Sequence, residues 1–183
     1  MTRHSVLAGL IVVFALALPG STSAQTPPAA SDVVATAVAK AKAENKAVLI
    51  EFGASWCTWC RNFEAFVKSP DAGPILAEHF VIVNLTVRER DDKKVLEHPG
   101  GNGLMDGWGG AMSGLPFYVF LNGAGGKVAD SNAMPDGTNI GFPAVPDEIR
   151  AFIALMDKAV PALPAVHRDT LQSYLVRVMP KAN

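Results

Sequence analysis

A short apolar segment that runs directly into two closely spaced cysteines constrains the fold of this chain more than any other feature. Residues 47–53 are almost continuously apolar, as expected for a buried central strand. The chain has two cysteines, and both lie in the motif Trp-Cys-Thr-Trp-Cys of residues 56–60. A strand, a Cys-x-x-Cys turn and a helix in succession are typical of dithiol–disulfide chemistry. Closing so short a loop constrains the unfolded chain little, which favours a reactive pair over a structural one.

The N-terminus has the pattern of a targeting signal. Arg3 and His4 provide a basic start, residues 6–18 are almost wholly apolar, and small residues lead up to Ala24. This order predicts a signal peptide over residues 1–24 that is cleaved after Ala24. A retained membrane anchor is the alternative, but the apolar run is shorter than the ~20 residues that cross a bilayer. We therefore expect a periplasmic or secreted protein, exported in a Gram-negative bacterium, without stable membrane insertion after cleavage.

Composition divides the remaining chain into three parts and excludes one class of partner. A Pro- and Ala-rich linker is expected over residues 25–31, one domain over residues 32–160, and a helical extension over residues 161–183. The formal net charge is −1 and no basic block is present. Nucleic acid is therefore not expected as a partner.

Hydrophobic periodicity and turn residues predict a chain that alternates between strands and helices. Three stretches are expected to lack regular structure: a solvated charged segment at 88–94, a long flexible Gly-rich loop at 99–114, and a loop at 131–146. The expected elements are a helix capped by Asp32, a strand at 47–53, a helix at about 57–68, a short helical turn at 75–78, strands at 79–87, 116–121 and 127–130, a helix capped by Asp147, and a last helix at 166–179.

The two cysteines are expected to have different roles. Cys57 should lie at the start of a helix, where backbone N–H groups and the helix dipole stabilise a thiolate. Cys60 should lie one turn deeper and be shielded. We therefore expect Cys57 to attack a substrate disulfide and Cys60 to resolve the mixed disulfide.

Three other uses of the cysteine pair are a zinc half-site, a haem attachment site and inert core thiols. Zinc needs two further ligands, and His79, His98 and His167 are not at ligand spacing. Haem attachment needs a histidine after the second cysteine, but Arg61 stands there. The pattern favours redox chemistry over these alternatives, and no metal is expected at the site.

Two segments of the chain resemble the thioredoxin superfamily. Residues 48–61 are similar to the active-site segment of that family, and residues 114–123 are similar to its cis-proline strand and hairpin. The resemblance covers roughly residues 32–160. It implies a thioredoxin-like α/β fold, with a central mixed sheet flanked by helices and an extra C-terminal helix outside the minimal fold. It also implies chemistry without a cofactor, on protein thiols and disulfides, with an unidentified upstream redox partner.

The resemblance implies roles for individual residues. Cys57 is the nucleophile and Cys60 the resolving thiol. Glu51, six residues before Cys57, matches a buried acid whose raised pKa lets it take a proton from Cys60, although a salt bridge at the strand is the alternative. The substrate-binding residues are Trp56, which covers the site, Trp59 at its rim, Leu115, whose backbone bonds an extended substrate, and Pro116, expected to be cis and to face the disulfide.

The pair Thr58-Trp59 between the cysteines lacks the histidine of strong oxidants, which favours the reducing direction. Two other functions stay open. The first is a Cu(I) chaperone that uses both thiolates, an alternative that Met105 and Met112 in the Gly-rich segment support. The second is an interaction module whose disulfide is vestigial. Trp108, with the two methionines, is expected to form either an apolar lip near the disulfide or a plain surface insertion.

Overall fold

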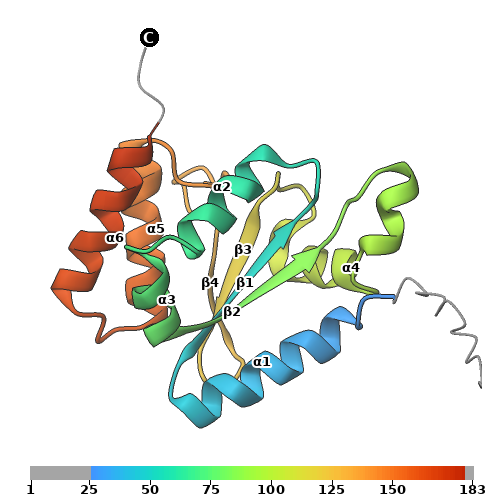
Figure 1. The fold of residues 1–183 in the computed structure, drawn as a ribbon, viewed down its shortest axis with the longest axis horizontal. Helices are drawn as coiled ribbons and strands as arrows, with labels where there is room; N and C mark the ends of the chain where they lie inside the picture. The colour runs from blue at the N-terminus through green and yellow to red at the C-terminus, as the bar shows by residue number, and fades with distance from the viewer. Residues whose placement is uncertain (1–25, 180–183) are drawn as a thin grey trace, which may run out of the picture.

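The computed structural model describes residues 26–179, in which four strands form one sheet (Figure 1). The strands are β1 (Ala47–Gly53), β2 (Phe80–Thr86), β3 (Phe117–Leu121) and β4 (Lys127–Asp130), in the order β2-β1-β3-β4. Strand β1 pairs with β2 in parallel and with β3 antiparallel, and β3 pairs with β4 antiparallel. This is the mixed sheet that the sequence predicts. The predicted signal peptide over residues 1–24 lies outside the described residues.

Helices cover both faces of this sheet (Figure 1). Helices α1 (Ala30–Glu44) and α4 (Gly101–Met105) pack on one face. Helices α2 (Thr58–Val67), α3 (Gly73–His79), α5 (Pro146–Ala159) and α6 (Ala165–Val178) pack on the other. The expected thioredoxin-like α/β architecture with an added C-terminal helix is confirmed. Among the described residues, no helix combines the length and apolarity needed to cross a bilayer.

The near-continuous apolar sequence of β1 follows from this double burial, since all seven of its residues are buried. Side chains of a strand alternate between the faces of a sheet. Val48, Ile50 and Phe52 accordingly pack on the α1 side, while Leu49 packs on the α2 side. Glu51 has the same parity as Leu49, which places a carboxyl group on the face covered by α2.

Two predicted helix caps are wrong. Helix α1 begins at Ala30, inside the stretch expected as linker, so Asp32 lies in its first turn and Ala29 occupies the cap position. Helix α5 begins at Pro146, and Asp147 likewise lies in the first turn. Proline is favoured at the first helical position and acidic residues in the first turn, so these residues still mark helix starts.

The Gly-rich segment 99–114 is not the long flexible loop that its composition predicts. It folds into α4 and a following π-helical turn, Asp106–Gly110, and Met105 is fully buried. A Cβ atom on Gly110 would lie 2.6 Å from Met105 Cγ and 2.9 Å from a ring carbon of Phe117. Here glycine serves close packing, which composition alone does not distinguish from flexibility.

Candidate functional site

The disulfide lies where β1 passes into α2. Cys57 and Cys60 are bonded, with their Cα atoms 5.3 Å apart. Cys57 is the N-cap residue of α2, and its Sγ accepts a hydrogen bond of 3.0 Å from the backbone N–H of Cys60. A thiolate at Cys57 would therefore receive an N–H donor at the positive end of the helix dipole, as the sequence predicts.

Both cysteines are buried, as predicted for Cys60, although in this oxidised form Cys60 is no more enclosed than Cys57. Cys57 is 4% exposed and Cys60 is 8% exposed. The cause is local packing, because Ala54 and Leu115 form a small apolar cluster with both cysteines. Leu115 thus contacts the disulfide from a segment that is distant in sequence.

Residues after β2 hold the turn before Cys57. Glu89 is buried and accepts hydrogen bonds from the Ser55 backbone N–H at 2.6 Å and from the Ser55 hydroxyl at 2.9 Å. The indole N–H of Trp56 donates to the Arg88 carbonyl at 2.8 Å. The guanidinium of Arg90 lies 4.2 Å from the centre of the Trp56 ring, within cation–π range. Trp56 directly precedes Cys57 in sequence and remains 40% exposed.

The Arg88 side chain connects this turn to the segment that leads into β3. Its guanidinium donates to the carbonyls of Ser113 at 2.6 Å, Ala111 at 2.9 Å and Gly110 at 3.0 Å. Arg88 adopts a left-handed backbone conformation with φ of 52°. The expectation that residues 88–94 are simply solvated is therefore wrong at its first two positions, because their side chains bond to distant backbone and hydroxyl groups.

Leu115, which packs against the disulfide, is joined to Pro116 by the cis peptide bond that the family resemblance implies. Asn139 holds the backbone on both sides of this bond. Its side-chain amide donates to the Gly114 carbonyl at 2.9 Å and to the Pro116 carbonyl at 3.0 Å. Its carbonyl oxygen accepts from the Gly141 N–H at 3.1 Å, which ties the 131–146 loop to the same point.

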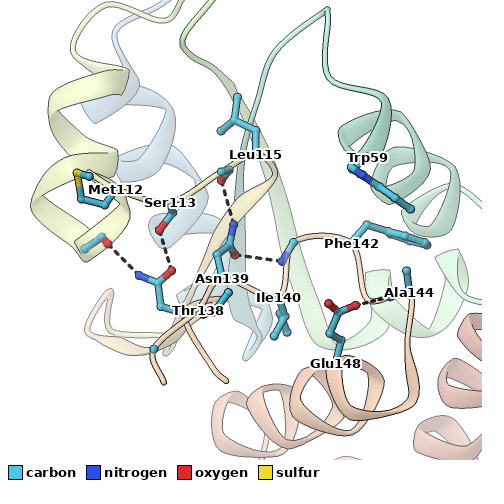
Figure 2. A pocket seen from close by; sticks show the side chains of 15 residues that line it. Trp59, Met112, Ser113, Leu115, Thr138, Asn139, Ile140, Phe142, Ala144 and Glu148 are labelled. Atoms are coloured by element: carbon cyan, nitrogen blue, oxygen red, sulfur yellow. Dashed lines mark hydrogen bonds between the residues drawn. The ribbon is translucent and has the colours of Figure 1, made fainter. Parts of the chain in front are cut away.

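An open cavity of about 560 Å³ lies between Trp59, Leu115 and the loop that carries Asn139 and Phe142 (Figure 2). The Trp59 ring stacks on Phe142 with centroids 6.2 Å apart and forms one wall. Met112, which is 98% exposed, stands at the opposite side with Leu115 between them. Neither cysteine lines the cavity, but Trp59, which lies between the cysteines in sequence, and Leu115, which packs against them, both border it. Residues that line it include Trp59, Met112, Leu115, Asn139, Phe142 and Glu148.

The predicted apolar lip is thus only partly present. Met112 is at the surface of the cavity, but Met105 is buried in the core. Trp108 is half-buried, with its ring 6.0 Å from that of Phe52. Because Met105 is enclosed, it offers no sulfur at the surface beside the thiols.

Glu51 is a buried acid on the α2 side of β1. It is 3% exposed, and its Oε2 accepts a hydrogen bond of 2.6 Å from the Asn84 side chain. Its Oε1 has no hydrogen-bond partner among the described residues. Burial raises the pKa of Glu51 to about 7, the Asn84 hydrogen bond opposes this shift, and the negative charge of Glu64 adds to it.

Glu51 and Cys60 line the same solvent-open cavity, of about 540 Å³, with Asn84 and Glu64. A Cβ atom on Gly53 would lie 2.6 Å from Glu51 Oε1, so glycine at this position leaves room for the carboxyl group. An acid with a pKa of about 7 is half ionised at neutral pH and can both accept and return a proton.

Sequence reasoning missed Asn139, Glu89 and the clamp formed by Arg88. Each acts on a segment between 22 and 34 residues away, counted along the chain. The local signal was weak: Asn139 lies in a loop-like stretch, and the other two belong to a charged run. An unpaired charge next to a buried strand end was the one available indication for Glu89.

Comparison with known proteins agrees with this geometry. The sequence model of the thioredoxin-like family matches residues 29–123, just over half of the chain. The fold, with a Cys-x-x-Cys disulfide at the start of α2, defines a thioredoxin-like protein. The chain belongs to the thioredoxin-like family, and family and disulfide together support a thiol–disulfide oxidoreductase.

The solved structures similar to this chain share less than 20% of its sequence in the three cases that follow. A disulphide isomerase from Xylella fastidiosa Temecula1 is 19% identical with a TM-score of 0.49, covering 90% of this chain and 98% of that one. A DsbH oxidoreductase is 17% identical with a TM-score of 0.48, covering 82% and 96%. The C-terminal domain of Neisseria meningitidis DsbD, in the oxidised form, is 16% identical with a TM-score of 0.41, covering 58% and 84%. Identities this low indicate similarity of fold alone. No curated protein matches the chain.

Proposed function

We propose that this chain is an exported thiol–disulfide oxidoreductase that reduces disulfides in protein substrates. The observation that carries the proposal is the Cys57–Cys60 disulfide at the N-cap of α2, bordered by Leu115 and by a cavity large enough for part of a polypeptide. Reactive dithiols in this family context act by exchange through a mixed disulfide.

In the reducing direction the cycle begins with both thiols reduced. The Cys57 thiolate attacks one sulfur of the substrate disulfide, forming the Cys57–substrate bond and releasing the other substrate sulfur as a thiolate. Cys60 loses its proton to the Glu51 carboxylate and attacks Cys57 Sγ, which releases the second substrate thiolate. The substrate has then gained two electrons and leaves as two thiolates. One thiolate takes the proton that Glu51 received from Cys60, and the other takes a proton from solvent. The chain then holds the Cys57–Cys60 disulfide. An upstream dithiol reduces that disulfide and becomes oxidised in turn.

Glu51 is proposed as the proton acceptor in the second step. Its pKa of about 7, which burial raises, lies near the operating pH expected for this step. It shares a solvent-open cavity with Cys60, so a bridging water can carry the proton between them. Asn84 is a positioning residue, since it holds one carboxyl oxygen at 2.6 Å.

The reducing direction rests on what surrounds the sulfurs. Thr58 and Trp59 separate the cysteines, and neither carries a charge that would stabilise a thiolate. Among residues 26–179, no cationic side chain donates a hydrogen bond to either sulfur, and the nearby Arg61 donates instead to the Ser55 carbonyl and the Thr58 hydroxyl. Less stabilisation of the reduced form corresponds to a more reducing couple.

Substrates are proposed to bind in the cavity bordered by Trp59 and Leu115. The stacked Trp59 and Phe142 rings give an apolar wall, and the backbone of Leu115 is presented to an extended segment. A Cys60→Ser variant should accumulate mixed disulfides with protein substrates through Cys57, while the matched Cys57→Ser variant should accumulate none. If Cys57→Ser instead traps the substrates, the assignment of nucleophile and resolving thiol is reversed.

The direction is tested by the reduction potential of the couple, measured by equilibration with glutathione and followed by tryptophan fluorescence. We expect a value closer to the about −270 mV of thioredoxin than to the about −120 mV of a strong oxidant. A value near −120 mV would contradict the reducing direction and leave the exchange mechanism intact.

Export is proposed from residues 1–24 alone. Expression in a Gram-negative host should yield a periplasmic protein whose first residue is Gln25, as read by mass spectrometry. A chain that retains Met1 in the membrane fraction would support the anchor instead.

A further inference from the structure

Two histidines meet on the side of the molecule that carries the C-terminal helix. His79 is the last residue of α3 and His167 lies in the first turn of α6, 88 residues further along the chain. His79 Nε2 lies 2.9 Å from His167 Nδ1. Sequence spacing gave no indication of this pair, because the fold alone brings the end of α3 to the start of α6.

A carboxyl group completes a set of three possible ligands. Glu78 Oε1 lies 3.7 Å from His79 Nε2. The two ring nitrogens and a carboxyl oxygen of Glu78 all lie within 4.8 Å of one another. Two imidazoles and one carboxylate are a donor set that zinc binds in proteins, with the fourth position left for water.

The spacing of these atoms fits a tetrahedral ion. Zinc bonds nitrogen and oxygen at about 2.0–2.2 Å, which separates two tetrahedral ligands by about 3.3 Å. The two observed separations, 2.9 Å and 3.7 Å, lie on either side of this value. The third separation, between the Glu78 oxygen and His167, is within 4.8 Å. Rotation of the exposed Glu78 side chain would bring its oxygen to a bonding position beside both imidazoles.

The surroundings leave the site reachable from solvent. The His79 side chain is 14% exposed, and that of Glu78 is 60% exposed. Two cations, Lys42 and Lys46, line an open cavity together with His79 and would oppose a bound metal. The ammonium group of Lys46 is paired with Glu44 at 2.8 Å, which offsets its charge.

We propose that Glu78, His79 and His167 bind one divalent transition-metal ion of the zinc type. On binding, the ring that carries the shared proton changes tautomer: the proton moves through solvent to that ring's other nitrogen, so both imidazoles stay neutral and each facing nitrogen gives its lone pair to the metal. The ion fastens the start of α6 to the end of α3. Helix α6 lies beyond residues 29–123, which the family model matches, so the site ties an added helix to the family's core. Hard cations such as Mg²⁺ and Ca²⁺ prefer all-oxygen sites and are not bound.

The test is calorimetric titration of the untagged protein with ZnCl₂. The Cys57–Cys60 disulfide is kept intact and verified by thiol assay, because reduced thiolates bind zinc themselves. We expect one Zn²⁺ per chain and a rise in the melting temperature on binding. His79→Ala and His167→Ala should each weaken binding at least tenfold and abolish the rise in melting temperature, and Glu78→Gln should weaken binding severalfold.

Asp169→Asn is the matched control, since it neutralises an exposed acid on α6 two residues from His167. Binding to this variant should equal that of the parent. His79 is largely enclosed, so His167→Gln provides a second histidine variant if His79→Ala does not fold. The proposal is overturned if the oxidised parent takes up no Zn²⁺, if the His167 variants bind as tightly as the parent, or if Asp169→Asn loses binding to the same degree. Because the disulfide stays closed throughout, these outcomes are independent of the proposed exchange activity.

Discussion

Replacing Glu51 by Gln should stabilise the protein in a strongly pH-dependent way. The ordinary carboxyl pKa of 4.5 is raised to about 7 by burial in the folded state. Between these two values the folded chain holds a proton that the unfolded chain has released, so stability falls as pH rises through this window. A tenfold change in proton affinity corresponds to about 1.4 kcal/mol, so the full loss above pH 7 is about 3 kcal/mol.

Glutamine keeps the shape of the side chain and an oxygen for the Asn84 hydrogen bond, but it cannot ionise. Near pH 4 the unfolding free energies of the parent and of Glu51→Gln should therefore be similar. At pH 8.5 the unfolding free energy of Glu51→Gln should exceed that of the parent by about 3 kcal/mol. Urea denaturation of the oxidised forms at a series of pH values measures this difference. A difference that stays constant across pH 4–8.5 would falsify the raised pKa and remove the basis for Glu51 as a proton acceptor.

Three further changes test separate parts of the structure. Tyr118→Phe should raise the unfolding free energy in urea by about 1 kcal/mol, because the buried hydroxyl has no partner in the described part of the chain; a loss of stability would contradict this. Leu171→Ala, which removes a fully buried α6 side chain, should cost about 2–5 kcal/mol while leaving the reduction potential unchanged. Asn139→Ala frees the carbonyls on either side of the cis peptide bond and should raise KM for a protein disulfide severalfold; an altered reduction potential with unchanged KM would refute the positioning role.

Much of the fold was predictable because its signals are local. The strand at residues 47–53 is recovered with identical bounds, since a segment buried on both faces is almost continuously apolar, here with Glu51 as the exception. The cysteine pair at the start of a helix follows from the same short segment, as Cys57 caps α2. Helix ends were less well predicted, because Asp32 and Asp147 favour both the cap position and the first turn.

The segment at 99–114 shows why composition misleads. Because glycine has no Cβ atom, it suits both flexible loops and segments in which the backbone packs closely against other groups. Only the residues that surround it in the folded structure show which of the two applies. With Met105 and Phe117 packed against Gly110, the segment is a helical turn that joins the core.

What the sequence by itself determined is the chemistry: a dithiol next to a buried strand, an acid six residues before it, and a family that this spacing resembles. Tertiary structure alone decided which distant groups serve that chemistry. Arg88, Glu89 and Asn139 reach the site through long-range hydrogen bonds, and His79 meets His167 across 88 residues. The physical reason is that periodicity and turn signals act over one or two turns of chain. Contacts between separate elements depend instead on how the helices pack on the sheet, which no single segment encodes.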